Sequence, residues 1–172
     1  MKEATEVIGV NVKKLTTLSL SVALSMILSF VESQIPAFVA VPGIKVGLSN
    51  IVTVFLIYKL GWRAAGAVSL VRVFLSSVLF GSSVSLIYSL SGAVFSFVIM
   101  LIMKRMSLFS ELGVSVGGGI FHNIAQIMTA MLIMENGKIA MYLPALLISG
   151  TIAGAVVGII AAILVKKLDR IL

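Results

Sequence analysis

The chain has 172 residues, of which 60% are hydrophobic and 11% are charged, and its mean hydropathy is +1.21. Soluble domains are about 45–50% apolar and about 25% charged, so this composition excludes a soluble globular protein. The chain contains no cysteine, which excludes disulfides, thiolate metal sites and cysteine nucleophiles. With six acidic residues and one histidine, we expect no bound metal and no cofactor.

Six apolar segments follow one another along the chain, and a membrane-spanning helix needs roughly 20 such residues. In chain order they cover residues 15–31, 46–60, 64–80, 84–103, 112–134 and 141–165. The first is not a convincing signal peptide, because Glu3 and Glu6 replace the basic region and no A-x-A site follows. The sequence therefore predicts an all-α integral membrane protein, a single domain over residues 1–172 built as a six-transmembrane-helix bundle.

The basic residues predict how this bundle is oriented. With the N-terminus inside, the outer segments hold only Lys45 and Lys138, and Arg72 lies within a span. Basic residues concentrate in cytoplasmic loops, so both termini are expected in the cytoplasm, in the plasma (cytoplasmic) membrane. The net charge of +7 then mostly reflects this membrane topology, and we expect no nucleic-acid partner. The expected cytoplasmic set is Lys2, Lys13, Lys14, Lys59, Arg63, Lys104, Arg105, Lys166, Lys167 and Arg170.

Small residues recur every four positions in two of the segments, which places them on one helical face. In the sixth segment the set is Gly150, Gly154, Gly158 and Ala162. Such faces let helix backbones approach closely in lipid, and here we favour packing inside the protein. The first segment carries Thr17, Ser21, Ser25 and Ser29. That stripe could serve internal packing or present a face to another subunit, and both interpretations stay open.

Polar side chains at membrane depth mark candidate binding residues. An arginine at the centre of a span costs about +2.5–3.5 kcal/mol on insertion scales, so Arg72 needs compensation. The choices are Glu32, carbonyl groups, hydroxyls such as that of Ser76, water, or an anionic ligand. Two interpretations of Arg72 stay open: a structural arginine bonded to carbonyl groups at a helix break, or a residue with a ligand-binding or gating role. If the role is ligand binding, Arg72→Ala should weaken binding without unfolding the protein.

The fifth segment holds three hydrogen-bonding side chains in two turns, which are too many to face lipid. His122 and Gln126 share a face, Asn123 lies beside them, and Gly118 and Gly119 stand one turn earlier. The glycines allow close approach of a helix or of a ligand. Hydrogen bonding between helices is the simpler interpretation, and ligand binding is the alternative.

The first outer loop, residues 33–50, is apolar and rich in proline and glycine. A solvated loop would be more polar, so this composition predicts a lid folded over the bundle. Lys45 and Asn50 would then lie near the rim beneath it. Ser89, in the outer half of the fourth segment, would lie close by.

Catalytic motifs are missing from the sequence. It has no G-x-x-x-x-G-K-[ST] phosphate loop and no H-E-x-x-H, and no clear internal repeat. Prenyl diphosphate chemistry normally uses paired aspartates that hold magnesium, whereas Asp169 is the only aspartate here. We therefore expect a binding or conduction module that is not itself an enzyme.

Three stretches carry a family resemblance over nearly the whole chain: residues 42–52, 72–77 and 118–126. Their amino-acid sequences are similar to those of the membrane family called "Gx transporter" or "heptaprenyl diphosphate synthase component I". The six-helix layout also resembles the substrate-binding (S) components of energy-coupling factor (ECF) transporters.

The S-component resemblance implies an outer pocket closed by the first outer loop, and a small-residue face on the first helix that docks the coupling transmembrane subunit. Two ATPase subunits would supply energy. The ligand-binding residues expected on this basis are Lys45, Asn50, Arg72, Ser89, His122, Asn123 and Gln126. The expected docking residues are Thr17, Ser19, Ser21, Ala23 and Ser25, and the sequence leaves open whether the Ser19/Ala23 face or the serine stripe docks.

Two functions follow from these resemblances. The leading hypothesis is the S-component of an ECF-type ABC importer that captures a small vitamin or cofactor precursor, expected to be anionic. The alternative is a membrane accessory subunit of isoprenoid or quinone (polyprenyl diphosphate) biosynthesis, which predicts an apolar groove open to the membrane and a separate catalytic chain. A structural or redox-linked membrane subunit is a third possibility, although no haem or iron–sulfur ligand set supports electron transfer.

Overall fold

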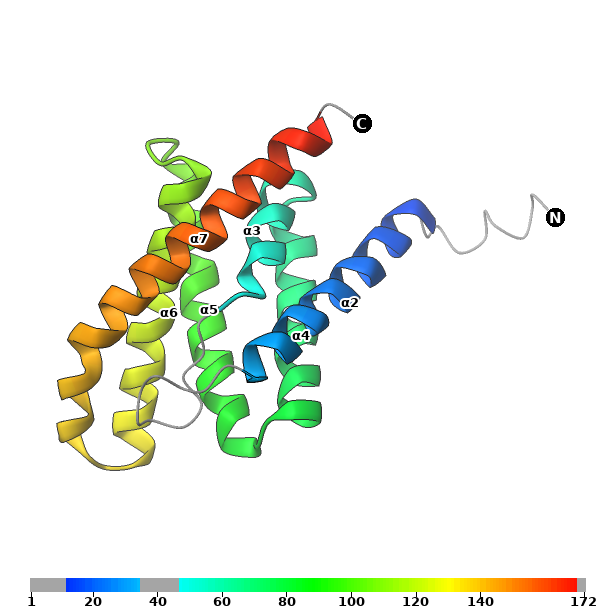
Figure 1. The fold of residues 1–172 in the computed structure, drawn as a ribbon. Coiled ribbons are helices and arrows are strands. Elements are labelled where there is room, and N and C mark those ends of the chain that lie inside the picture. The colour runs from blue at the N-terminus through cyan, green and yellow to red at the C-terminus, as the bar shows by residue number, and fades with distance from the viewer. Residues whose placement is uncertain (1–11, 35–46, 170–172) are drawn as a thin grey trace.

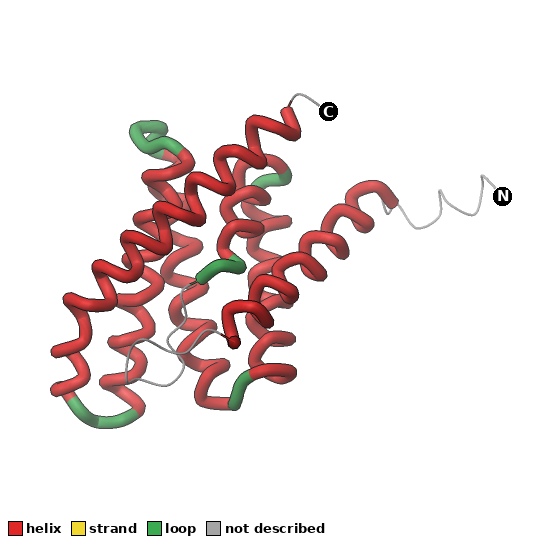
Figure 2. Tube along the Cα trace, in the orientation of Figure 1, coloured by secondary structure: helices red, strands yellow, loops and turns green. Residues whose placement is uncertain are grey.

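The computed structural model describes residues 12–34 and 47–169, and every regular element in these residues is helical (Figures 1 and 2). The prediction of an all-α bundle is confirmed for this part of the chain. In chain order the elements are α2 (Val12–Gln34), α3 (Asn50–Lys59), α4 (Trp62–Phe80), α5 (Ser83–Arg105), α6 (Glu111–Ile133), the 3₁₀ helix η1 (Gly137–Tyr142) and α7 (Leu143–Asp169).

Local sequence explains where several helices begin and end. The Ser82 side chain caps α5 by accepting a hydrogen bond from the Ser85 amide at 3.2 Å, and Ser110 caps α6 in the same way. Both are residue types that favour this position. Lys104 and Arg105 occupy the last turn of α5, where positive charge interacts favourably with the helix dipole.

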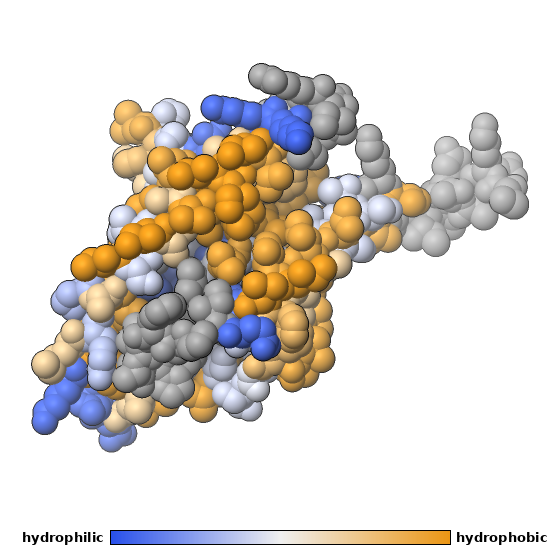
Figure 3. All heavy atoms as spheres, viewed as in Figure 1, coloured by the Kyte–Doolittle hydropathy of each residue, from blue (hydrophilic) through white to orange (hydrophobic). Residues whose placement is uncertain are grey.

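Five helices are long and apolar enough to cross a membrane: α2, α4, α5, α6 and η1–α7 together. Their outward side chains are largely apolar, and Figure 3 shows this surface between polar residues gathered toward its two ends. Lipid is the solvent that such a surface requires. The chain is therefore a multi-pass membrane protein.

The second predicted span differs from the structure. The apolar segment 46–60 contains only the 10-residue helix α3, which is about 15 Å long at 1.5 Å per residue. The hydrocarbon core of a bilayer is about 30 Å thick, so α3 cannot cross it alone. Hydropathy did not reveal this because α3 is apolar throughout and lies among other helices, with Val54 and Leu56 fully buried.

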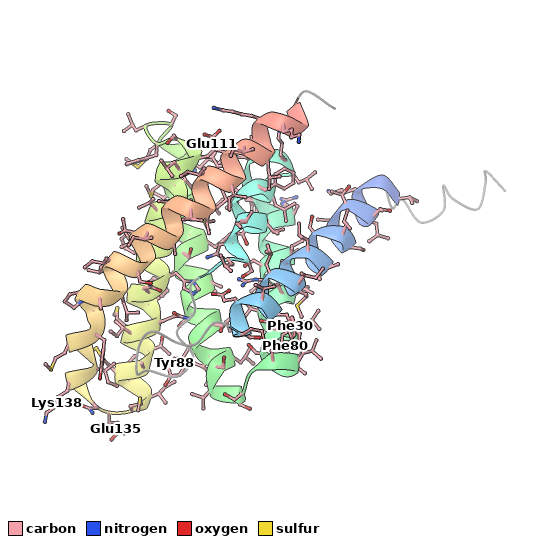
Figure 4. All side chains as sticks on the ribbon, viewed as in Figure 1. Phe30, Phe80, Tyr88, Glu111, Glu135 and Lys138 are labelled. Atoms are coloured by element: carbon pink, nitrogen blue, oxygen red, sulfur yellow. The ribbon has the colours of Figure 1, made fainter. Side chains whose placement is uncertain are left out.

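The main core lies around α3. Buried side chains of α3, including Val54 and Leu56, pack with Val68 of α4, Met100 of α5 and Val114 of α6. The helix α2 crosses one side of this core and packs mainly on α4. Phe30 of α2 and Phe80 of α4 come together at the end of that contact, with ring centroids 5.2 Å apart (Figure 4).

Glycines bring α6 and α7 into backbone contact. A Cβ atom on Gly119 would lie 2.5 Å from the Gly150 carbonyl oxygen, and one on Gly154 would lie 2.8 Å from Val116 Cα. Gly158 packs equally closely on Leu112. These contacts confirm the prediction that the glycines of the sixth segment pack inside the protein. Gly119 of α6 allows the close approach of a helix, α7.

Candidate functional site

A buried polar junction lies where α3 begins, and we define it as Glu32, Gly47, Ser49 and Arg72. Glu32, on α2, accepts a hydrogen bond from the Gly47 amide. Arg72, on α4, donates one to the Ser49 hydroxyl. Glu32 is 5% exposed and Arg72 is 7% exposed. The junction therefore ties α2 and α4 to the start of the half-length helix.

This geometry supplies part of the compensation that Arg72 requires. The negative charge of Glu32 stabilises the guanidinium, and the Ser49 hydroxyl accepts one of its hydrogen bonds. The Ser76 hydroxyl, the other group considered, instead donates to the Val73 carbonyl at 3.2 Å. Arg72 Nε is buried and has no hydrogen-bond partner among the described residues. One donor of the guanidinium is thus left over.

Gly47 has the backbone conformation that this junction needs. Its φ is +88°, in the left-handed region that glycine enters at little cost. An added Cβ would lie 3.0 Å from the Asn50 side-chain nitrogen. This glycine turns the chain into α3 while its amide faces Glu32.

The second polar group lies between α5 and α6. His122 and Gln126 are buried on α6, and both pack on Gly92 of α5. A Cβ on Gly92 would lie 2.8 Å from His122 Cε1 and 3.0 Å from Gln126 Cγ. Ser89, one turn away on α5, is buried, and its hydroxyl has no partner within the described part of the chain.

Asn123 turns to the other side of α6. Its Nδ2 donates to the Leu146 carbonyl of α7 at 2.7 Å, so it joins α6 to α7. The structure thus places Arg72 with α3, His122 and Gln126 against α5, and Asn123 against α7. Binding of one ligand by this set stays a prediction, and each contact already has a structural use between helices.

Asn123→Leu should lower the free energy of unfolding by about 1 kcal/mol, since hydrogen bonds between membrane helices are worth roughly 0.6–1.7 kcal/mol. Reversible unfolding in mixed micelles measures this in the absence of any added ligand. Thr151→Leu is the control, because Thr151 is exposed and its hydroxyl bonds the Leu147 carbonyl of its own helix. An Asn123 variant as stable as the wild-type protein would show that this side chain does not hold the helices together.

A very small cavity lies beside the junction. Gly47, Asn50, Ser96 and Gly118 contribute to its lining, and its volume is about 10 Å³. That is room for about one water molecule. Ser96 is 1% exposed, and its hydroxyl has no partner among the described residues. The cavity that these residues line is too small to hold a vitamin-sized ligand.

Two predicted features have different outcomes. Lys45 and most of the proposed lid fall outside the described residues. On α2, Ser21, Ser25 and Ser29 are buried in the bundle, Thr17 is half-buried, and Ser19 and Ala23 are exposed. The serines of the stripe therefore pack inside the bundle and Ser19 and Ala23 lie on its exposed surface, while docking of a partner by this helix stays a prediction.

A lateral groove, whose position the sequence did not predict, runs between α4 and α5. It is lined by side chains between Trp62 and Leu70 of α4 and between Ala93 and Val98 of α5, and its volume is about 440 Å³. The groove exists because Gly66, Ala67 and Ala93 have small side chains, and Trp62 and Val94 at its edges are exposed. The groove is almost entirely apolar and opens toward lipid.

A basic hollow lies next to the groove, at the end of the bundle. This hollow has a volume of about 430 Å³ and is lined by Ile57, Gly61, Trp62, Leu101, Lys104 and Arg105. Trp62 lines both spaces, and Arg63 lines the groove beside it, its guanidinium carbon 5.3 Å from the Trp62 ring centroid. Cationic side chains thus lie beside one end of the apolar groove.

Lys104 is held in place by α3. Its Nζ donates to the Ile57 carbonyl at 2.6 Å and lies 4.7 Å from the Tyr58 ring centroid. Glu111, at the start of α6, lies near the same end of the bundle, whereas Glu135 and Lys138 are at the opposite end (Figure 4). Glu111 is not among the residues that line the hollow.

The sequence did carry one signal for this groove. Arg63, Lys104 and Arg105 are all among the residues predicted at the cytoplasmic face, and Gly66 and Ala67 lie one helical turn after Arg63. Their joint position depends on α4 and α5 being neighbours, which periodicity alone does not establish. Ser49 and Gly92 were missed for the same reason: their partners come from other helices.

Comparison with known proteins gives one family. The model of the family described as heptaprenyl diphosphate synthase component I matches residues 21–164. No curated protein and no solved structure matches. Because the match covers well over half of the sequence, the chain belongs to this family.

Proposed function

We propose that this member of the heptaprenyl diphosphate synthase component I family is a membrane accessory subunit of polyprenyl diphosphate biosynthesis. The observation that carries the proposal is the family match over residues 21–164. The family's description names one component of a synthase, which implies a second. In this proposal the chain resides in the plasma membrane and assembles with that second component.

Catalysis is assigned to the partner chain. The sequence has a single aspartate, Asp169, whereas binding magnesium diphosphate usually takes paired carboxylates. The contribution of this chain would be to hold the growing or finished product in the membrane. A long prenyl chain is apolar, and moving it from a soluble synthase into lipid exposes much of that surface to water unless a membrane subunit receives it.

The lateral groove supports this interpretation. It is apolar, lies between two membrane-spanning helices and opens toward lipid, as the accessory-subunit hypothesis predicts. Among the described residues, the cavity beside the junction, of about 10 Å³, is too small to be a ligand pocket.

Reconstitution tests the proposal. The purified chain in proteoliposomes, given an allylic diphosphate primer and radiolabelled isopentenyl diphosphate, should form no product alone. Adding an aspartate-rich prenyl synthase chain from the same cell should give product, with at least about fivefold more long-chain polyprenyl diphosphate than the synthase gives with empty liposomes. Equal synthesis with and without this chain would reject the accessory role.

An S-component of an ECF-type importer is the second candidate, and the buried polar junction is the observation in its favour. Half-length helices with charged residues near the bilayer centre form ligand sites in several transporter folds. Here Arg72 and the start of α3 would meet an anionic vitamin precursor, with Lys45 and Asn50 nearby. The exposed Ser19/Ala23 face of α2 would dock the coupling subunit, and two ATPase subunits would drive transport.

A further inference from the structure

We propose that the lateral groove and the basic hollow together form one binding site for a polyprenyl diphosphate. The diphosphate lies among Arg63, Lys104 and Arg105, and the first isoprene units lie between α4 and α5. This inference rests on the proposed function for the choice of lipid. The shape and charge of the site are independent of that choice.

The two halves of the site match the two halves of such a molecule. The groove side is lined by Gly66, Ala67 and Phe97 and is almost wholly apolar. The hollow adds two cations, Lys104 and Arg105, and its lining includes no acidic residue. Because Trp62 lines both, the two spaces are neighbours, and the proposed ligand would lie across this side chain. Burial of that chain and charge-assisted hydrogen bonds to its head would act together.

Charge and width favour a prenyl diphosphate over a phospholipid. A diphosphate carries several negative charges in a small volume, and Lys104 and Arg105 line the hollow while Arg63 lines the groove beside it. A groove of about 440 Å³ between two adjacent helices suits the first part of one chain. The rest of a long prenyl chain would pass through the open side into lipid.

The site also sets a direction. Lys104 and Arg105 end α5, and Arg63 lies in the first turn of α4, at the end of the bundle that carries both the α3–α4 and the α5–α6 turns (Figure 1). Basic residues concentrate on the cytoplasmic side of membrane proteins. The diphosphate would therefore face the cytoplasm, where a soluble synthase releases its product.

Direct binding to the purified chain, with no partner present, tests this site. The probe is geranylgeranyl diphosphate, titrated by isothermal calorimetry into protein in dodecylmaltoside micelles. Trp62, the one tryptophan in the sequence, provides a local fluorescence signal in the same titration. Geranylgeraniol, inorganic diphosphate and phosphatidylglycerol are titrated separately, so that the chain, the head group and an ordinary anionic lipid are each examined.

Variants assign the binding to each half of the site. Arg63→Gln combined with Arg105→Gln should weaken binding at least about tenfold, and so should Ala67→Leu, since a loss of 1.4 kcal/mol is tenfold in Kd. Lys166→Gln with Lys167→Gln removes the same charge from α7, and Ala145→Leu adds the same bulk to an exposed position of α7. Both controls should bind as the wild-type protein does.

Three results would overturn the proposal: no binding of geranylgeranyl diphosphate, binding that the groove variants leave unchanged, or equally tight binding of phosphatidylglycerol. The last would identify an anionic phospholipid site. None of these depends on a synthase, so the accessory role can survive failure here. Equally, a chain that binds the probe but never stimulates a synthase would retain this site and lose the proposed function.

Discussion

Arg72→Ala should lower the free energy of unfolding by about 1–3 kcal/mol, because a buried polar group that loses its partner costs about that much in desolvation. Glu32 would then be buried without the guanidinium that now stabilises it, and Ser49 would lose its bond to Arg72. Unfolding in mixed micelles gives the free energy, and size-exclusion after heating gives the matching shift in melting temperature.

A double replacement separates the charge pair from the shape of the site. Arg72→Met alone should be strongly destabilising, whereas Arg72→Met with Glu32→Gln should recover part of the loss, because no unpaired charge then remains. If Arg72→Ala unfolds like the wild-type protein, the junction does not hold α3. In that case the ligand role expected from the sequence would be the better interpretation of Arg72.

Gly154→Leu should cost about 3 kcal/mol, the upper part of the range for overpacking a closely packed position. The new Cβ would lie 2.8 Å from Val116 Cα and 2.9 Å from the Ser115 carbonyl oxygen. Both are backbone atoms, so relief requires α6 and α7 to move apart. Thermal melting in detergent and the yield of monodisperse protein measure the effect.

Gly137→Leu is the matched control, since a Cβ at Gly137 meets nothing within 4 Å. It should melt within a few degrees of the wild-type protein. Equal melting temperatures for the two variants would contradict the close α6–α7 contact.

Several elements of this fold follow from hydropathy and spacing alone. The long helices α4, α5 and α6 were expected close to their observed bounds, because a span of about 20 apolar residues has few alternatives in lipid. Gly150 and Gly154 were expected to pack inside the protein, since a four-residue repeat places them on one face whatever the neighbouring helix is.

The half-length helix α3 illustrates what hydropathy omits. The segment 46–60 is apolar enough to span, yet only Asn50–Lys59 is helical. A buried short helix and a lipid-facing long one have the same composition, and the difference depends on neighbours that the sequence does not specify. The partners of Arg72 were open for that reason: Glu32 was considered, while Ser49 was not.

The candidate sites divide in the same way. His122, Asn123 and Gln126 were correctly expected to avoid lipid, because all three are buried, but adjacency on one helix did not reveal that they face different neighbours. The lateral groove was missed because its apolar residues look like any lipid-facing surface. Only the pairing of α4 with α5 brings Gly66 and Ala67 beside Ala93 in the groove, next to the hollow that Arg105 lines.

Native mass spectrometry of the gently purified protein, with extraction and identification of whatever is bound, tests the central claim most directly. The account predicts a polyprenyl diphosphate at up to one molecule per chain, retained by the wild-type protein and depleted in the Ala67→Leu variant. A stoichiometric water-soluble vitamin or cofactor precursor, unaffected by Ala67→Leu, would contradict it and establish the importer subunit instead.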